Sequence, residues 1–206
     1  MESKRKPFLI RLAVTAVLTA LSSVFMYYEV PLPFMPPFLK FDFSEIPVLI
    51  GSFAIGPIWG VVIELLKNLI HLPMTQTAGI GEMSNFITGS IFVVTAGLIY
   101  NKFHSKPGIV LSTAVATIVL ALAGIPLNAY VTLPLYANVL GFTTEAIVGM
   151  SQAVNPLITD KWTLILWGFV PFNLFKGVIV SIITFLLSIP LTRPLRAIRR
   201  KAGLRA

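Results

Sequence analysis

The chain has 206 residues, of which 56% are hydrophobic and only 12% are charged, and its mean hydropathy is +0.86. One soluble core cannot hide that many apolar side chains, so the composition predicts an integral membrane protein. The net charge of +8 does not indicate nucleic-acid binding, because the basic residues cluster at the two ends and in one short loop. The lack of cysteine excludes disulfides, thiolate metal sites and cysteine nucleophiles.

Long apolar stretches predict an all-α membrane protein with six transmembrane helices, forming a single domain over residues 1–206. A helix needs about 20 residues to cross a hydrocarbon core of about 30 Å. The first stretch follows basic residues as a signal peptide does, but it is too long and ends in bulky residues, so we expect it to be retained. The expected spans are residues 8–28, 44–56, 57–72, 82–101, 108–131 and 162–190.

The second and third expected spans are short and meet at the sequence IGPIWG. Gly56 and Pro57 would end one helix and begin the next, because proline suits a first helical turn and disfavours helix at the preceding residue. The alternative is one long kinked helix from Ile46 to Leu72, which would leave five crossings and place the basic carboxyl-terminal tail outside.

The positive-inside rule favours six spans with both termini in the cytoplasm. In that arrangement 12 of the 16 basic residues lie inside, and Glu2 is the one acidic residue among them. These basic residues are Lys4, Arg5, Lys6, Arg11, Lys102, Lys106, Arg193, Arg196, Arg199, Arg200, Lys201 and Arg205.

The expected outer loops, residues 29–43, 73–81 and 132–161, are long and rich in Pro, Gly, Thr and Asn. Irregular backbone near membrane depth persists only where protein or a wet cavity satisfies its polar groups. We therefore expect these loops to form the walls and lid of a ligand site.

Several polar residues interrupt the expected spans. Lys176 lies near the middle of the last span, where a charge costs about 2.5–3.5 kcal/mol on insertion scales, and Asn173 shares its helical face. Asn128 lies at the outward end of the fifth span, and Glu82 and Asn85 share a face in the fourth. Together these residues predict a polar site in the outer half, although snorkelling of Lys176 and local capping or packing bonds are the alternatives.

Glu64 and Lys67 are three residues apart, so they are interpreted as a local ion pair and left out of the site.

The sequence PPFLKFDFSEIP places Lys40, Asp42 and Glu45 just outside the second span. A re-entrant loop could pair these charges with Lys176, with backbone groups or with a bound polar molecule. Phe38 and Leu39 would provide an apolar wall suited to a flat heteroaromatic ligand. The alternative is an interfacial aromatic loop with surface charges.

Ala13, Ala16 and Ala20 form a stripe of small residues on one face of the first span. Small residues permit close helix contact in lipid, so the stripe predicts either packing within this chain or contact with a partner subunit.

The chain contains no GxxxxGK[ST], HExxH or GxSxG motif, which argues against ATP hydrolysis by a P-loop and against a zinc or serine hydrolase. We therefore expect a protein that is not an enzyme. A stand-alone secondary transporter is the alternative to a substrate-binding subunit.

The segments PPFLKFDFSEIPVLIGSFAIGPIWG, TAGIGEMSNFITG and PFNLFKG resemble, in that order, the riboflavin-binding S components of energy-coupling factor (ECF) vitamin transporters. The resemblance covers nearly the whole chain. It implies a multi-pass subunit in the plasma membrane of a prokaryote that binds riboflavin, with its phosphate FMN as an additional candidate ligand and no cofactor. Energy would come from a transmembrane T protein and two cytoplasmic ATPases.

The resemblance also implies functional residues. The small-residue stripe with Ala16 and Ala20 would contact the T protein, with Ala13 on the same face. The residues expected to bind the ligand by motif are Asn128, Asn173, Lys176, Phe38, Leu39, Lys40 and Asp42, and those placed there by neighbourhood are Thr77, Gly79, Glu82 and Asn85.

Overall fold

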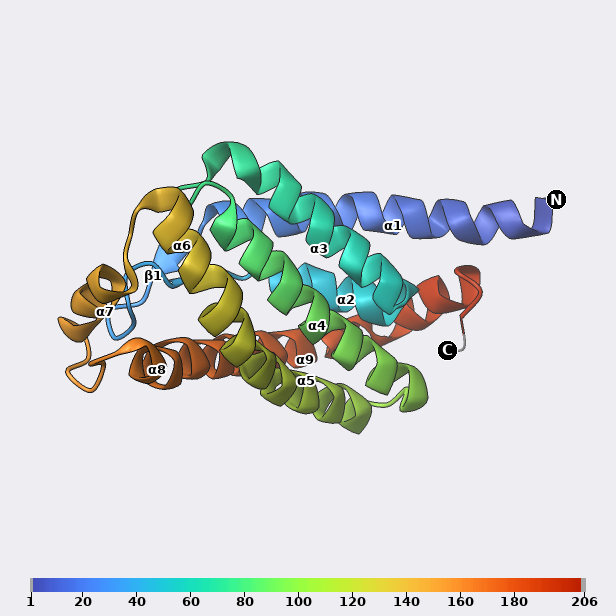
Figure 1. The fold of residues 1–206 in the computed structure, drawn as a ribbon. Helices are drawn as coiled ribbons and strands as arrows, with labels where there is room; N and C mark the ends of the chain where they lie inside the picture. Colours follow the sequence, from blue (N-terminus) through green and yellow to red (C-terminus); the bar gives the residue numbers. More distant parts are fainter. Residues whose placement is uncertain (1, 205–206) are drawn as a thin grey trace.

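The computed structural model describes the backbone of residues 2–204 and the side chains of residues 5–204, and it is almost entirely helical (Figure 1). Of the basic residues used to predict orientation, the side chains of Lys4 and Arg205 lie outside the described part. The main helices are α1 (Glu2–Tyr27), α2 (Glu45–Ile55), α3 (Pro57–His71), α4 (Ile80–Lys102), α5 (Lys106–Leu127) and α9 (Val170–Lys201). Shorter elements are β1 (Val30–Pro31), β2 (Lys40–Phe41), a 3-10 turn (Leu72–Met74), α6 (Leu133–Leu140), α7 (Thr144–Gln152) and α8 (Lys161–Leu164).

Within the described residues, four helical segments are long and apolar enough to cross a membrane by length and composition: Arg5–Tyr27, Ile80–Lys102, Lys106–Leu140 and Lys161–Lys201. The helix α2 has 11 residues and α3 has 15, so each is shorter than these four. Six crossings therefore stay a prediction, while the helical class is confirmed.

The helices α2 and α3 form a hairpin, which excludes one continuous helix over residues 46–72. Gly56 separates them with a φ of 102°, a conformation that favours glycine, and Pro57 opens α3 as expected. Gly60 on α3 lies so close to Ser52 on α2 that a Cβ at residue 60 would be 3.0 Å from the Ser52 side chain. Because α2 is apolar on nearly all sides, it is buried almost completely within the bundle.

The segment 132–161 is not the long loop that we expected, because α6 and α7 occupy more than half of it and α8 begins at its end. The fifth helix continues through a π turn at Asn128–Thr132 into α6, although Pro126 and Pro134 flank this turn. A π turn widens the helix locally and can provide a new donor for the carbonyl that proline leaves without one. A second π turn, Ile165–Phe169, joins α8 to α9.

Two further boundaries differ from the expected spans. The first helix begins at Glu2 instead of residue 8, and α9 continues past Pro190 and Pro194 to Lys201. Leu195 and Arg199 are buried there, and the Arg199 guanidinium donates to the carbonyl of Phe53, so packing against α2 holds this extension in helical form.

The two ends of the bundle have different characters (Figure 1). At one end lie the described termini, the turn at Gly56 and the α4–α5 connection, joined by bonds from Arg11 to the Ala202 carbonyl at 2.6 Å and from Arg199 to Asn101 Oδ1 at 3.0 Å. At the other end lie the β1–β2 ribbon, α6, α7 and α8. The antiparallel ribbon pairs Val30 with Phe41 and Pro31 with Lys40, which brings the ends of the first outer loop together.

Candidate ligand-binding site

A cavity of about 440 Å³ lies beneath the connections at the end opposite the termini. Its lining comes from the first outer loop, α4, the α5–α6 segment, α7 and the first turns of α9. This volume falls within the range of about 300–1,000 Å³ that is usual for small-molecule sites.

All but one of the residues expected to bind the ligand lie on the lining of this cavity. Gly79 is the exception, since it precedes α4 with a left-handed φ of 84° and serves the turn. That the other ten residues bind a ligand stays a prediction. The lining residues among them are Phe38, Leu39, Lys40, Asp42, Thr77, Glu82, Asn85, Asn128, Asn173 and Lys176.

Lys176 is paired with the first outer loop and does not snorkel to an interface. Its Nζ lies 3.0 Å from Asp42 Oδ2, and both side chains are almost fully buried. The other carboxylate oxygen of Asp42 accepts from the Ser44 backbone N–H at 2.7 Å. Burial alone would raise the pKa of Asp42, but the Lys176 and Lys67 ammonium groups and the bond from Ser44 lower it to about 2. The expectation that a loop charge compensates Lys176 is therefore confirmed.

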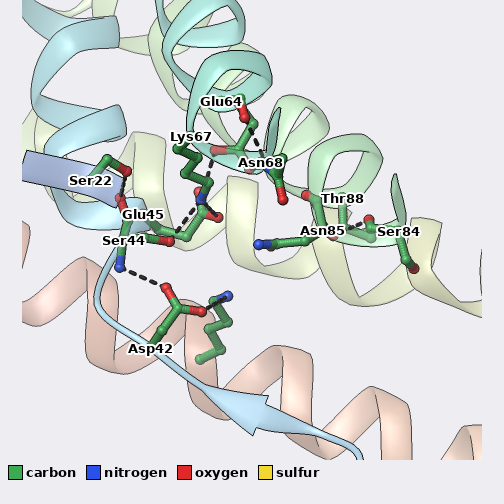
Figure 2. A network of polar contacts seen from close by, with 11 residues as sticks. Ser22, Asp42, Ser44, Glu45, Glu64, Lys67, Asn68, Ser84, Asn85 and Thr88 are labelled. Atoms are coloured by element: carbon green, nitrogen blue, oxygen red, sulfur yellow. Dashed lines mark hydrogen bonds and ion pairs between the residues drawn. The ribbon is translucent and has the colours of Figure 1, made fainter. Parts of the chain in front are cut away.

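The local pair of Glu64 and Lys67 is also confirmed, with 3.0 Å between Glu64 Oε2 and Lys67 Nζ. The pair belongs to a larger network, however, because Lys67 Nζ also donates to Glu45 Oε1 at 2.6 Å and to Ser44 Oγ at 2.8 Å (Figure 2). Glu45 lines the cavity, so this network reaches the site. Sequence spacing alone gave no signal for these contacts between α3 and the start of α2.

Two amides approach the cavity from neighbouring helices. Asn128 begins the π turn after α5 and donates to the Gly124 carbonyl at 2.7 Å. Asn173 is on α9, and a Cβ at Gly124 would be 2.6 Å from its Nδ2. Glycine at residue 124 therefore lets the two asparagines lie at the same level of the cavity.

Aromatic residues form much of the apolar wall. Phe38 contacts Phe169 and Tyr136, with ring centroids 5.7 and 6.5 Å apart. Phe172 and Phe92 also line the cavity. None of these four aromatic residues was expected from the sequence. Phe169 and Phe172 precede Asn173 and Lys176 by four residues each, so helical periodicity could have indicated them.

Polar contacts connect residues at the rim of the cavity. Lys40 Nζ donates to Glu29 at 2.6 Å and to Gln76 at 2.8 Å, so the first outer loop is tied to the α3–α4 connection. Glu82 accepts from Thr75 at 2.8 Å and contacts His71 Nδ1 at 2.9 Å. These contacts place Glu82 in a network that orders the α3–α4 connection.

The small-residue stripe does not pack inside the bundle. Ala13, Ala16 and Ala20 are all exposed, while Thr15 and Thr19 on the opposite face of α1 are buried. Of the two interpretations of this stripe, packing within the chain is therefore wrong.

The arrangement defines a membrane protein that binds a small molecule between helices and loops. It brings aromatic walls, two amides and paired charges around one cavity. Among the described residues there is no group of three potential metal ligands.

The comparisons with known proteins agree with this class. The family of the substrate-specific component of ECF transporters matches residues 10–188. The chain is 33% identical to the riboflavin transporter RibU of Staphylococcus aureus (strain TCH60), covering 86% of this chain and 87% of that protein. It is 28% identical to the riboflavin transporter FmnP of Bacillus subtilis (strain 168), covering 88% and 91%.

A solved S component of a bacterial ECF transporter superposes with a TM-score of 0.71 at 31% identity, covering 90% of this chain and 97% of that one. The chain therefore belongs to the substrate-specific component family of ECF transporters. This family consists of transporter components and not of enzymes, as expected.

Proposed function

We propose that this chain is the riboflavin-binding S component of an ECF transporter and that riboflavin occupies the cavity under the outer connections. The observation that carries the proposal is the combination, in one cavity, of an aromatic wall with amides and paired charges. A flavin matches this combination, because its flat apolar ring suits an aromatic wall and its polar edge and hydroxylated chain suit amides and charges. The riboflavin transporters named above support the choice of ligand.

In the proposed complex the ring lies against Phe38 and Phe169, where aromatic contacts add to the burial of apolar area. Asn128, Asn173 and Lys176 hold the polar edge and the hydroxyl groups. Glu45 is an addition to the residues expected from sequence, because it lines the cavity and Lys67 holds its carboxylate in place. A carboxylate has several acceptor positions, so a ligand hydroxyl could donate to it.

The proposed topology has six crossings in a prokaryotic plasma membrane, with both termini in the cytoplasm. Exposed basic residues at the terminal end support this orientation, among them Lys6, Lys102, Arg193 and Arg200. The ligand would then enter from outside, and a T protein with two ATPases would supply the energy for its release inside.

Titration of the detergent-purified protein with riboflavin, followed by quenching of flavin fluorescence, tests the ligand. We expect saturable quenching with one riboflavin per chain, and FMN added as a competitor tests whether the phosphate is accepted. Absence of a saturable signal with the wild-type protein would overturn the proposal.

Uptake measurements separate this function from a stand-alone secondary transporter. Cells that express the chain alone should accumulate no riboflavin, whereas co-expression with a T protein and the two ATPases should restore uptake. Uptake by the chain alone that stops when an ion gradient is collapsed would instead identify a secondary transporter.

A further inference from the structure

We propose that Lys67 is a positioning residue for ligand binding, which holds the first outer loop and Glu45 in the binding geometry although it does not line the cavity. The proposal rests on the proposed function, because it concerns the affinity for riboflavin. Figure 2 shows the network around Lys67, which joins α3, the start of α2 and the loop before it.

Lys67 is completely buried, so its ammonium group depends on protein acceptors. An ammonium group has three hydrogens to donate. Lys67 Nζ donates to Ser44 Oγ at 2.8 Å and to Glu45 Oε1 at 2.6 Å, and it forms an ion pair with Glu64 Oε2 at 3.0 Å. Both hydrogen-bond acceptors lie where the first outer loop enters α2, and of the three partners only Glu64 belongs to the same helix as Lys67.

Ser44 is the point at which the loop is fixed. Its hydroxyl accepts from Lys67, its carbonyl accepts from Ser22 Oγ on α1 at 2.6 Å, and its N–H donates to Asp42 at 2.7 Å. The same Asp42 carboxylate binds Lys176 in the cavity. A series of direct contacts therefore connects Lys67 with Lys176, and Ser44 is the link between α1, α3 and the cavity wall.

Glu45 connects Lys67 to the cavity a second time. Lys67 holds Oε1 of the carboxylate, and Oε2 is buried with no hydrogen-bond partner. Holding Oε1 fixes the position of the whole carboxylate on the cavity lining, where a hydroxyl of the ligand can donate to it. Gly89 on α4 leaves room for this arrangement, because a Cβ there would be 3.1 Å from Glu45 Oε1.

A purely structural ion cluster would stabilise the α2–α3 hairpin without affecting the affinity. Ser44→Ala separates the two roles, since it removes the bond from Lys67 to the loop without changing any charge. Ser52→Ala is the matched control, because Ser52 is equally buried on α2 and its hydroxyl donates to Val93 at 2.9 Å but does not line the cavity. Each substitution removes one buried hydrogen bond.

We expect the riboflavin Kd to rise about fivefold or more in Ser44→Ala and to stay within about twofold in Ser52→Ala, at similar losses of thermal stability. Lys67→Met should raise the Kd by roughly tenfold or more, since it also leaves the Glu45 carboxylate without its cation. Glu64→Gln retains the bonds from Lys67 to Ser44 and Glu45, so its Kd should stay within about twofold.

Amide hydrogen exchange of the ligand-free proteins measures how firmly the first outer loop is held, and it needs no riboflavin. Ser44→Ala should accelerate exchange in residues 40–46, and Ser52→Ala should not. Equal Kd values for the two serine variants, or unchanged exchange in residues 40–46, would overturn the role of Lys67. Failure of the wild-type protein to bind riboflavin would overturn the proposed function. The exchange comparison would then still test whether the bond from Lys67 to Ser44 holds the loop.

Discussion

At the residue scale, the contact between Lys176 and Asp42 explains how a lysine can occupy an apolar helix. A buried charge is costly alone, and a close opposite charge with further hydrogen bonds offsets that cost. Asp42 provides the opposite charge from a residue 134 positions earlier in the chain, at 3.0 Å. The pair therefore fixes the first outer loop against α9 and also places a cation beside the proposed ligand.

The variant Lys176→Met tests whether this lysine binds the ligand as well as neutralising Asp42. We expect the riboflavin Kd to rise by roughly tenfold to a hundredfold, because a hydrogen bond to a charged group contributes about 1.5–3 kcal/mol. The double variant Asp42→Asn/Lys176→Met removes both charges and should recover thermal stability but not affinity. Full recovery of affinity in the double variant would limit Lys176 to neutralising Asp42.

The acid stability of the protein gives a second test at this scale. The pKa of Asp42 is lowered from 3.8 to about 2, so ionised Asp42 favours the folded state. Its contribution is complete above its unfolded pKa and is lost as the pH falls through the folded pKa. We expect the thermal midpoint of the wild type to fall more steeply between about pH 4 and pH 2 than that of Asp42→Asn. Identical slopes for the two proteins would contradict the assignment.

At the element scale, two helices with π turns shape the cavity. Asn128 begins the first π turn, and Phe169 ends the second just before α9. Such widened turns often occur at functional sites, because they turn side chains out of the regular helical register. Gly124, one turn before Asn128, gives α9 the space to bring Asn173 to the same level.

The variant Gly124→Ala tests this packing. The added methyl group would lie 2.6 Å from Asn173 Nδ2, so the amide must move, and we expect the riboflavin Kd to rise about tenfold. Gly149→Ala on α7 is the control, because no atom lies within 4 Å of a Cβ there. Titration of the two variants side by side measures the difference, and equal affinities would show that the position of Asn173 does not matter for binding.

At the scale of the whole molecule, the proposed ligand cavity and the proposed contact surface for a partner subunit lie on different parts of the protein. The cavity lies at the end with the long connections, and the exposed basic residues gather at the end with the termini. The alanine stripe of α1 runs along the outside of the bundle. A partner subunit could therefore dock on α1 without entering the cavity.

Ala16→Trp tests this separation. A bulky side chain on the stripe should prevent close helix contact with the proposed T protein, so uptake in cells with the ATPases should be lost while riboflavin binding by the purified subunit is retained. Leu122→Trp on α5 provides a control, since Leu122 is also highly exposed but lies on another helix. Uptake at the wild-type level in Ala16→Trp would exclude the stripe as a contact surface.

The sequence by itself determined the features that depend on local chemistry. Hydropathy predicted a helical membrane protein, and Gly56 with Pro57 predicted the break between α2 and α3, because backbone preferences act over a few residues. The motifs also indicated the family, and they selected Asn128, Asn173 and Lys176, which the fold brings to one cavity.

The tertiary structure alone decided the contacts between distant segments. Spacing identified the pair of Glu64 with Lys67, but the bonds of Lys67 to Ser44 and Glu45 depend on how α3 folds back along α2. The helices α6 and α7 likewise form in an expected loop because their apolar residues, among them Leu133 and Ile147, pack into a buried cluster with the first outer loop. Hydrophobic periodicity assigns a face to each helix, whereas the partner of that face is set by packing of the whole bundle.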